Sequence, residues 1–142
     1  MYKKIFVPVD LNQESSWKMA LPVAVKMAQE NSAKLVVFSV VPDFGMAIVG
    51  SFFPPDHADN MLKEAEQNLK ALVEREVPAD VAVTSYVRHG TIYKRIIKAA
   101  DELGADLIVL ASHRPETKDY LLGPNAARVV RHARQSVFVV RE

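Results

Sequence analysis

Apolar residues along the chain fall into two patterns, and the first of them predicts strands. Four short runs are apolar without regular alternation, as is typical of strands that are covered on both faces of a parallel sheet. A fifth run alternates more clearly, which predicts a half-exposed strand near a sheet edge. The four runs are IFVPV (5–9), LVVFSVV (35–41), LIVLA (107–111) and VFVVR (137–141), and the fifth is VAVTSYV (81–87).

The second pattern lies between these runs and predicts amphipathic helices. Apolar residues recur there at helical spacing, so each segment has one apolar stripe. The stripes span 17–28, 61–72, 92–103 and 126–133. Pro22 lies inside the first stripe, where it should remove a hydrogen bond and bend the helix. Glu64 in the second segment should face water, and Gly104 should end the third helix as a C-cap.

Strands and helices alternate strictly along the chain, and this order defines the fold class. It predicts an α/β fold, a three-layer sandwich around a five-stranded, mainly parallel sheet with right-handed crossovers. Numbered along the chain, the strands should lie in the order 3-2-1-4-5. The length of 142 residues fits a single domain, 1–142. The connection 42–57 is too long and too apolar for an ordinary loop, so it could cover a ligand, bind another subunit or pack on its own domain.

Composition and charge narrow the classes of function. The chain has no cysteine, which excludes disulfides, thiol chemistry and cysteine-ligated zinc. Lys+Arg number 18 against 17 for Asp+Glu, and no basic stripe is present, so we expect no nucleic-acid partner. The first residues, MYKKIFVPVDLN, do not resemble a secretory signal, and no apolar run approaches the length of a membrane span. We therefore expect a cytoplasmic protein.

Polar residues follow two of the predicted strands at the place where a ligand should bind. In an open sheet of this strand order, ligands bind at the carboxyl ends of the strands where the order reverses, between 5–9 and 107–111. Asp10 could accept a hydrogen bond from a ribose hydroxyl or an adenine amino group, or it could serve as a helix N-cap or turn residue. The residues at these two strand ends are Pro8, Val9 and Asp10, and Ala111, Ser112, His113 and Arg114.

The segment after the fourth strand has the outline of a phosphate-binding loop. Backbone N–H groups, the Ser112 hydroxyl and the Arg114 guanidinium could hold phosphate oxygens, although a surface histidine and a solvated charge are the alternatives for His113 and Arg114. Gly123 precedes the last helix, whose N-terminus attracts phosphate, or it forms a simple turn. Pro124 suits the first helical position but offers neither an N–H nor a hydroxyl, whereas Asn125 can donate.

At these residues the chain resembles the universal stress proteins over its whole length. The resemblance is carried by KKIFVPVD, HGTIYKRIIKAADELGADLIVLASH and LLGPNAARVVRHARQSVFVV. The nucleotide-binding branch of that family has a signature of glycine, two residues, glycine, nine residues, then glycine and Ser or Thr. Here Ala111 and Arg114 replace the first two glycines, Gly123 is the third, and Pro124 takes the Ser/Thr position. Eight residues separate Arg114 from Gly123, one fewer than in the signature.

The form ASHRP followed by YLLG looks like a subgroup that keeps nucleotide binding without the full signature, although that subgroup usually has Ser after the glycine. The resemblance implies an adenine-nucleotide α-hydrolase-like fold and a site for ATP, or for ADP or AMP. Asp10 and the backbone of Val9 and Val40 would meet the adenosine. Any Mg²⁺ would be held by the phosphates and water, because no carboxylate cage is evident. The residues implied to line the ribose and phosphates are Ala111, Ser112, Arg114, Gly123 and Asn125.

Two functions from different classes follow. The first is an ATP-binding regulatory module of the stress response without efficient catalysis, since the chain lacks a Walker lysine motif. The second is an interaction protein of the same family that binds no nucleotide, which the departures at Ala111, Arg114 and Pro124 favour. An ATP pyrophosphatase is disfavoured because DLNQESS, without glycine, stands where such enzymes have SGGxDS. A dinucleotide oxidoreductase is disfavoured because no G-x-G-x-x-G occurs.

Two segments of the chain indicate that it forms oligomers. The last strand should be an apolar sheet edge, which invites pairing with a second copy. Because the family commonly dimerises through this strand, the resemblance implies a homodimer through 136–141, unless Arg141 and Glu142 shield the edge. The segment 42–57 could support a higher oligomer, and a regulatory module also implies a protein partner that the sequence does not identify.

Overall fold

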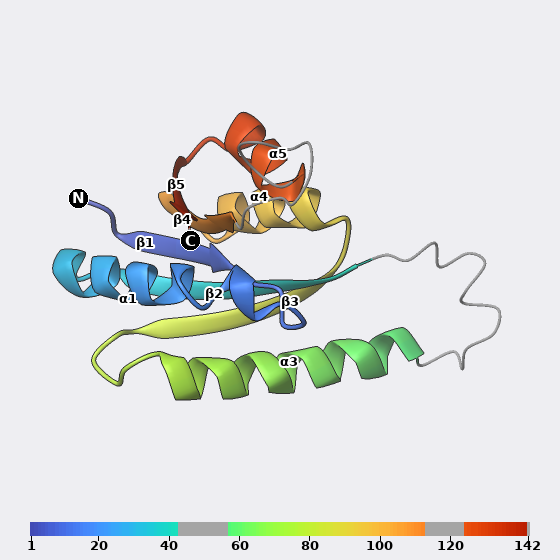
Figure 1. The fold of residues 1–142 in the computed structure, drawn as a ribbon. Coiled ribbons are helices and arrows are strands. Elements are labelled where there is room, and N and C mark those ends of the chain that lie inside the picture. The colour runs from blue at the N-terminus through green and yellow to red at the C-terminus, as the bar shows by residue number, and fades with distance from the viewer. Residues whose placement is uncertain (43–56, 113–123, 142) are drawn as a thin grey trace.

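The five predicted strands form one parallel sheet. The structure is a computed structural model that describes residues 1–42, 57–112 and 124–141. Within these ranges the strands lie in the order β3-β2-β1-β4-β5, and all four neighbouring pairs are parallel, as predicted (Figure 1). The strands are β1 (Lys4–Pro8), β2 (Lys34–Pro42), β3 (Val83–Gly90), β4 (Leu107–Ser112) and β5 (Ser136–Arg141).

Helices cover both faces of the sheet and complete the predicted three-layer sandwich. Helices α1 and α3 pack on one face, and α4 and α5 lie together on the other (Figure 1). A short 3-10 helix, η1, lies between β1 and α1. The helices are η1 (Glu14–Ser16), α1 (Ala20–Asn31), α3 (His57–Glu76), α4 (Ile92–Glu102) and α5 (Pro124–His132).

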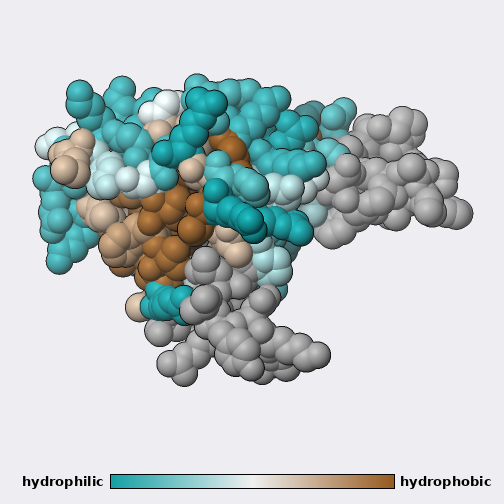
Figure 2. All heavy atoms as spheres, turned by 90° about the horizontal axis from the view of Figure 1, so that it is seen from above, coloured by the Kyte–Doolittle hydropathy of each residue, from teal (hydrophilic) through white to brown (hydrophobic). Residues whose placement is uncertain are grey.

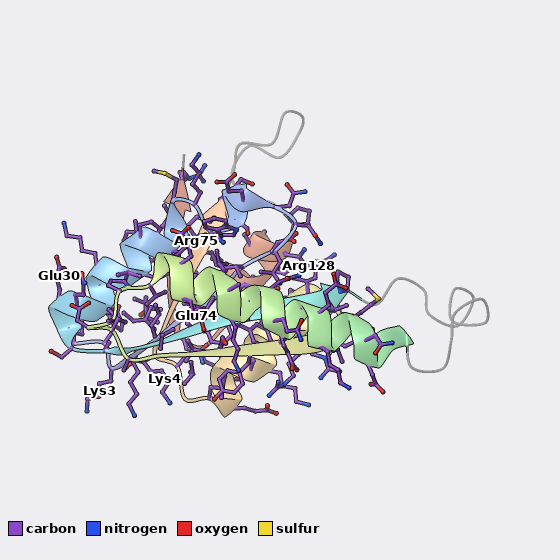
Figure 3. All side chains as sticks on the ribbon, turned by 90° about the horizontal axis from the view of Figure 1, so that it is seen from below. Lys3, Lys4, Glu30, Glu74, Arg75 and Arg128 are labelled. Atoms are coloured by element: carbon purple, nitrogen blue, oxygen red, sulfur yellow. The ribbon has the colours of Figure 1, made fainter. Side chains whose placement is uncertain are left out.

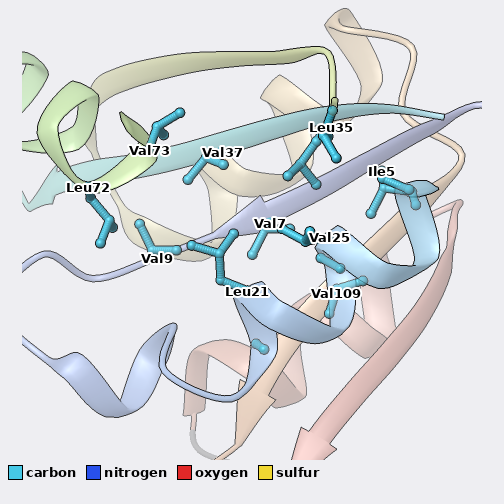
Figure 4. Packing of buried hydrophobic residues seen from close by; sticks show 14 of the residues in the cluster. Ile5, Val7, Val9, Leu21, Val25, Leu35, Val37, Leu72, Val73 and Val109 are labelled. Carbon is cyan, nitrogen blue, oxygen red and sulfur yellow. The ribbon is translucent and has the colours of Figure 1, made fainter. Parts of the chain in front are cut away.

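The core consists of two apolar clusters, one on each side of the sheet. Successive residues of a strand point to opposite faces, so a strand that is covered on both sides must be apolar throughout. Val7 and Val37 therefore pack towards α1 and α3 (Figure 4). Phe6 and Phe38 pack towards α4 and α5, with their ring centroids 5.1 Å apart. This alternation explains why the runs are apolar without a polar face.

Two helix ends show how local chemistry sets the boundaries. Helix α1 begins at Ala20, so Pro22 lies in its first turn, where an N–H has no partner within the helix. The predicted bend in mid-helix is therefore wrong. Gly104 follows the end of α4 with a φ of +69°, as expected of a C-cap glycine, and Ser32 adopts the same left-handed region after α1 with a φ of 52°.

A carboxylate joins the amino ends of the two central strands β1 and β4. Asp106 accepts hydrogen bonds from the backbone N–H of Lys3 at 2.8 Å and of Lys4 at 3.1 Å. The Lys4 ammonium donates to the carbonyl oxygen of Leu103 at 2.8 Å, near the end of α4. Lys3, Lys4 and Glu30 lie at one end of the molecule in Figure 3. These contacts fix the end of the sheet opposite to the carboxyl ends of the strands.

Candidate functional site

A cleft of about 580 Å³ opens at the carboxyl ends of β1, β2 and β4. It lies at the position that the strand order predicts, where the chain leaves β1 in one direction and β4 in the other. The cleft extends over both faces of the sheet, because residues of α3 border it on one side and residues of α4 and α5 on the other.

The two sides of the cleft differ in chemistry. The side towards α4 and α5 is apolar apart from Asn125, and its apolar members are Phe38, Val40, Ile92, Ile96, Leu110, Ala126 and Val129. The side towards η1 and α3 offers carboxylates, amides and hydroxyls, from Asp10, Asn12, Ser16, Ser39, Glu64 and Asn68. A flat apolar group therefore suits one side, and a group with several hydrogen-bond donors suits the other.

Asp10 combines a turn role with an unused acceptor. Its Oδ1 accepts a hydrogen bond from the backbone N–H of Asn12 at 2.9 Å, which is the local turn bond typical of aspartate. Its own backbone N–H donates to Ser16 Oγ at 2.8 Å, so η1 is tied to the end of β1. Within the described residues, Asp10 Oδ2 has no hydrogen-bond partner. The side chain is exposed at the cleft, so this oxygen can accept a bond from a ligand.

The backbone N–H of Val9 is paired with β2, whereas the backbone groups of Val40 lie beyond the last paired residue of β1. The Val9 N–H donates to the carbonyl oxygen of Phe38 at 2.7 Å and so continues the pairing with β2. Along a parallel strand, alternate residues direct their N–H and C=O groups to the same neighbour. Val40 lies two residues after Phe38, so its backbone groups point past the end of β1, where the cleft opens.

The remaining predicted residues divide into three groups. Ala111 and Asn125 line the cleft, and Asn125 lies in the first turn of α5. Ser112 is buried and pairs in register with Arg141 of β5. Pro124 is the exposed first residue of α5. Neither Ser112 nor Pro124 lines the cleft. His113, Arg114 and Gly123 lie outside the described residues, as does nearly all of the segment 42–57. Six predicted residues share the cleft: Pro8, Val9, Asp10, Val40, Ala111 and Asn125.

Sequence reasoning missed the contribution of α3. Glu64 is exposed, as expected, and it also borders the cleft together with Asn68. Ser39 was also missed, although it is the one polar residue in the run 35–41 and is only 5% exposed. A single hydroxyl inside a buried apolar strand is the signal that could have identified it, because a buried polar group needs a partner.

Metal-binding clusters and membrane-spanning helices are absent from the described residues. That part of the chain contains no group of three or more His, Cys, Asp or Glu side chains that could hold a metal ion. None of its helices is long and apolar enough to cross a membrane.

Comparison with known proteins identifies the class. The model of the universal stress protein family matches residues 1–141. The chain belongs to this family. It is 31% identical over 143 residues to universal stress protein G of Shigella flexneri, and the match covers 99% of this chain and 100% of that protein.

Solved structures of the family have the same fold. A universal stress protein in complex with cAMP is 25% identical, with a TM-score of 0.64, and the match covers 99% of this chain and 97% of that one. The universal stress protein from Archaeoglobus fulgidus in complex with dAMP is 19% identical, with a TM-score of 0.66 and 97% of both chains covered, and shares the fold.

Proposed function

We propose that this protein is an adenine-nucleotide-binding regulatory module of the stress response, a single domain over 1–142 that acts in the cytoplasm. The observation that carries the proposal is the pairing, at one cleft, of the unused Asp10 Oδ2 with the outward backbone groups of Val40. The carboxylate oxygen and the backbone N–H and C=O groups at the end of β2 can together form hydrogen bonds with the edge of a base or with the hydroxyls of a ribose. The related structure with cAMP bound supports an adenine nucleotide as the ligand.

The residues present fit a nucleotide. The cleft volume of about 580 Å³ falls within the roughly 300–1,000 Å³ typical of small-molecule sites. Its apolar side can receive the base, and its polar side offers acceptors for hydroxyl and amino groups. The first turn of α5 at Asn125 presents a helix N-terminus, which favours a phosphate. His113, Arg114 and Gly123, which lie outside the described residues, remain predicted phosphate contacts, whereas Ser112 does not line the cleft. Any Mg²⁺ would be bound by the phosphates and water.

We propose binding rather than catalysis. The ionisable residues of the described lining are Asp10 and Glu64, and this lining offers neither a histidine as general base nor a lysine to bind phosphates. Two carboxylates without such partners can hold a ligand but do little to activate a nucleophile. A bound nucleotide would instead change the surface that the protein presents to a regulatory protein partner.

Calorimetric titration of protein freed of copurified ligand tests this function. Asp10→Asn keeps Oδ1 for the turn bond of Asn12 but replaces the second acceptor by an amide NH₂. Losing a hydrogen bond to a charged group costs about 1.5–3 kcal/mol, so affinity for AMP should fall roughly tenfold or more. Glu30→Gln removes the same charge from the other end of the molecule and should bind as the wild type does (Figure 3). Equal affinities of the two variants would remove Asp10 from the site.

The edge strand β5 supports a second candidate, an interaction protein that dimerises whether or not it binds a nucleotide. Phe138 in β5 is 45% exposed, and Figure 2 shows an apolar area bordered by hydrophilic residues on the side where Figure 1 places β5. We propose a homodimer through 136–141, because an apolar edge strand can extend the sheet into a second copy. The segment 42–57 is the proposed contact for any higher oligomer.

Sedimentation equilibrium tests this assembly. Phe138→Ser should convert the dimer to a monomer, whereas Met19→Ser, at a residue 49% exposed near the start of α1, should not. A wild type that is monomeric throughout, or a dimer that survives Phe138→Ser, would contradict the proposed interface. Dimerisation without any nucleotide binding would make the second candidate the leading one.

A further inference from the structure

One side of the cleft carries an arrangement of polar groups that the proposed function does not by itself explain. Residues three and four apart on a helix share a face, and four such residues of α3 line the cleft. They are Met61, Glu64, Ala65 and Asn68. Within the described residues, the carboxylate of Glu64 makes no hydrogen bond or ion pair. The helix therefore presents an unpaired acceptor to the ligand.

Ser39 gives independent support for a ligand on this side. It lies on β2 beside Val37 in the alternation, so its side chain points towards the layer of α1 and α3. It is 5% exposed and lines the cleft, and its hydroxyl has no hydrogen-bond partner among the described residues. The hydroxyl oxygen is not among the buried side-chain atoms that lack a partner, so it is open to the cleft and can bond to a ligand there.

The charge of the described lining indicates what that ligand can be. The charged side chains of the described lining are Asp10 and Glu64, and both are acidic. Carboxylates favour neutral donors such as hydroxyl and amino groups, and they repel phosphates. Glu64 and Asp10 are exposed, so salt screens them. At low ionic strength and the effective dielectric near a protein surface, a pair of like charges on the order of 10 Å apart lowers affinity by up to about tenfold.

We propose that Glu64 is a specificity-determining residue that makes this cleft prefer adenosine and adenosine monophosphate to the triphosphate. Glu64, Ser39 and Asn68 receive the uncharged hydroxyl and amino groups of the nucleoside. A single phosphate can then lie at the first turn of α5, on the opposite side of the cleft from Glu64. Each further phosphate adds negative charge to a cleft that already holds two carboxylates. This inference rests on the proposed function and names the ligand class of the same site.

Titration calorimetry with adenosine, AMP and ATP, in buffer free of Mg²⁺, tests the preference. At low ionic strength the wild type should bind AMP up to about tenfold more tightly than ATP, and the difference should shrink as salt is added. Glu64→Gln keeps the size of the side chain and removes its charge, so it should strengthen ATP binding and lower the ratio of the AMP affinity to the ATP affinity, while the charge of Asp10 remains. Glu66→Gln, an exposed neighbour on α3 outside the cleft, is the matched control and should leave the ratio unchanged. Ser39→Ala should weaken adenosine and AMP by the same factor.

The outcomes separate this inference from the function on which it rests. ATP binding as tight as AMP in the wild type, or a Glu64→Gln variant that changes all three ligands equally, would overturn the preference and leave nucleotide binding intact. If added Mg²⁺ made ATP the tighter ligand only while Glu64 was present, Glu64 would be a metal ligand, which also overturns the preference. Binding of none of the three ligands would overturn the proposed function and this inference together.

Discussion

The carboxylate of Asp106 should contribute strongly to stability, because it joins the amino ends of β1 and β4. It accepts two backbone hydrogen bonds, from Lys3 at 2.8 Å and from Lys4 at 3.1 Å. Asp106→Ala removes both acceptors and leaves the partly buried N–H of Lys4 without a partner. A hydrogen bond to a charged group is worth about 1.5–3 kcal/mol, and the bond from Lys3 is exposed and worth less. We therefore expect the free energy of unfolding to fall by about 2–3 kcal/mol.

Urea denaturation followed by far-ultraviolet circular dichroism measures this loss. With a slope of roughly 1–3 kcal/mol per molar urea, the midpoint should fall by about 1 M while the slope stays constant. Asp80→Ala is the control, since Asp80 accepts only exposed bonds from Gln29 Nε2 at 3.3 and 3.2 Å. It should change stability by less than about 0.5 kcal/mol. A loss of that small size in Asp106→Ala would refute the role assigned to Asp106.

Two further predictions concern residues with positive φ. Gly90→Ala should destabilise the protein by about 1–3 kcal/mol, because a φ of +141° is a conformation that residues with a Cβ rarely adopt; the Arg95 side chain, 2.5 Å from the added Cβ at Nε, can move aside. Gly104→Ala, with φ at +69° and nothing within 4 Å of the added Cβ, should cost only about 1 kcal/mol. Equal losses in urea denaturation would contradict this account of backbone strain. Ser32→Gly should stabilise the protein by up to about 1 kcal/mol, because a φ of 52° is strained for a residue with a side chain. Scanning calorimetry should show a higher melting temperature, and a lower one would contradict this account.

The sheet could be predicted from sequence because strands buried on both faces leave unbroken apolar runs. Their bounds were less predictable where pairing with a distant strand decides them. Strand β3 was predicted over 81–87 but spans Val83–Gly90, because its last residues pair with the end of β2, and Gly90 lies opposite Pro42. The effect of Pro22 was misjudged for a related reason, because the apolar stripe that includes Trp17 begins before the helix itself does.

The position of the cleft was predictable from sequence, but its full lining was not. Strand order alone placed the cleft, and the residues that leave β1 and β4 then followed from the sequence. Glu64 and Asn68 lie beside the apolar stripe of α3 that buries Leu69 and Leu72. Whether such flanking residues meet water or a cleft depends on where the sheet ends beneath the helix, which is a tertiary feature. The spacing of apolar residues in α3 does not indicate where the sheet ends.

The central claim is that the cleft at the carboxyl ends of β1, β2 and β4 binds an adenine nucleotide. Two-dimensional amide NMR of ¹⁵N-labelled protein freed of copurified ligand tests it most directly, by addition of AMP. We predict saturable shifts for the backbone amides of Asp10, Val40 and Asn125, and none for Lys34 and Asp106 at the other end of the sheet. Absence of any saturable shift, or shifts confined to the amino ends of the strands, would contradict the claim.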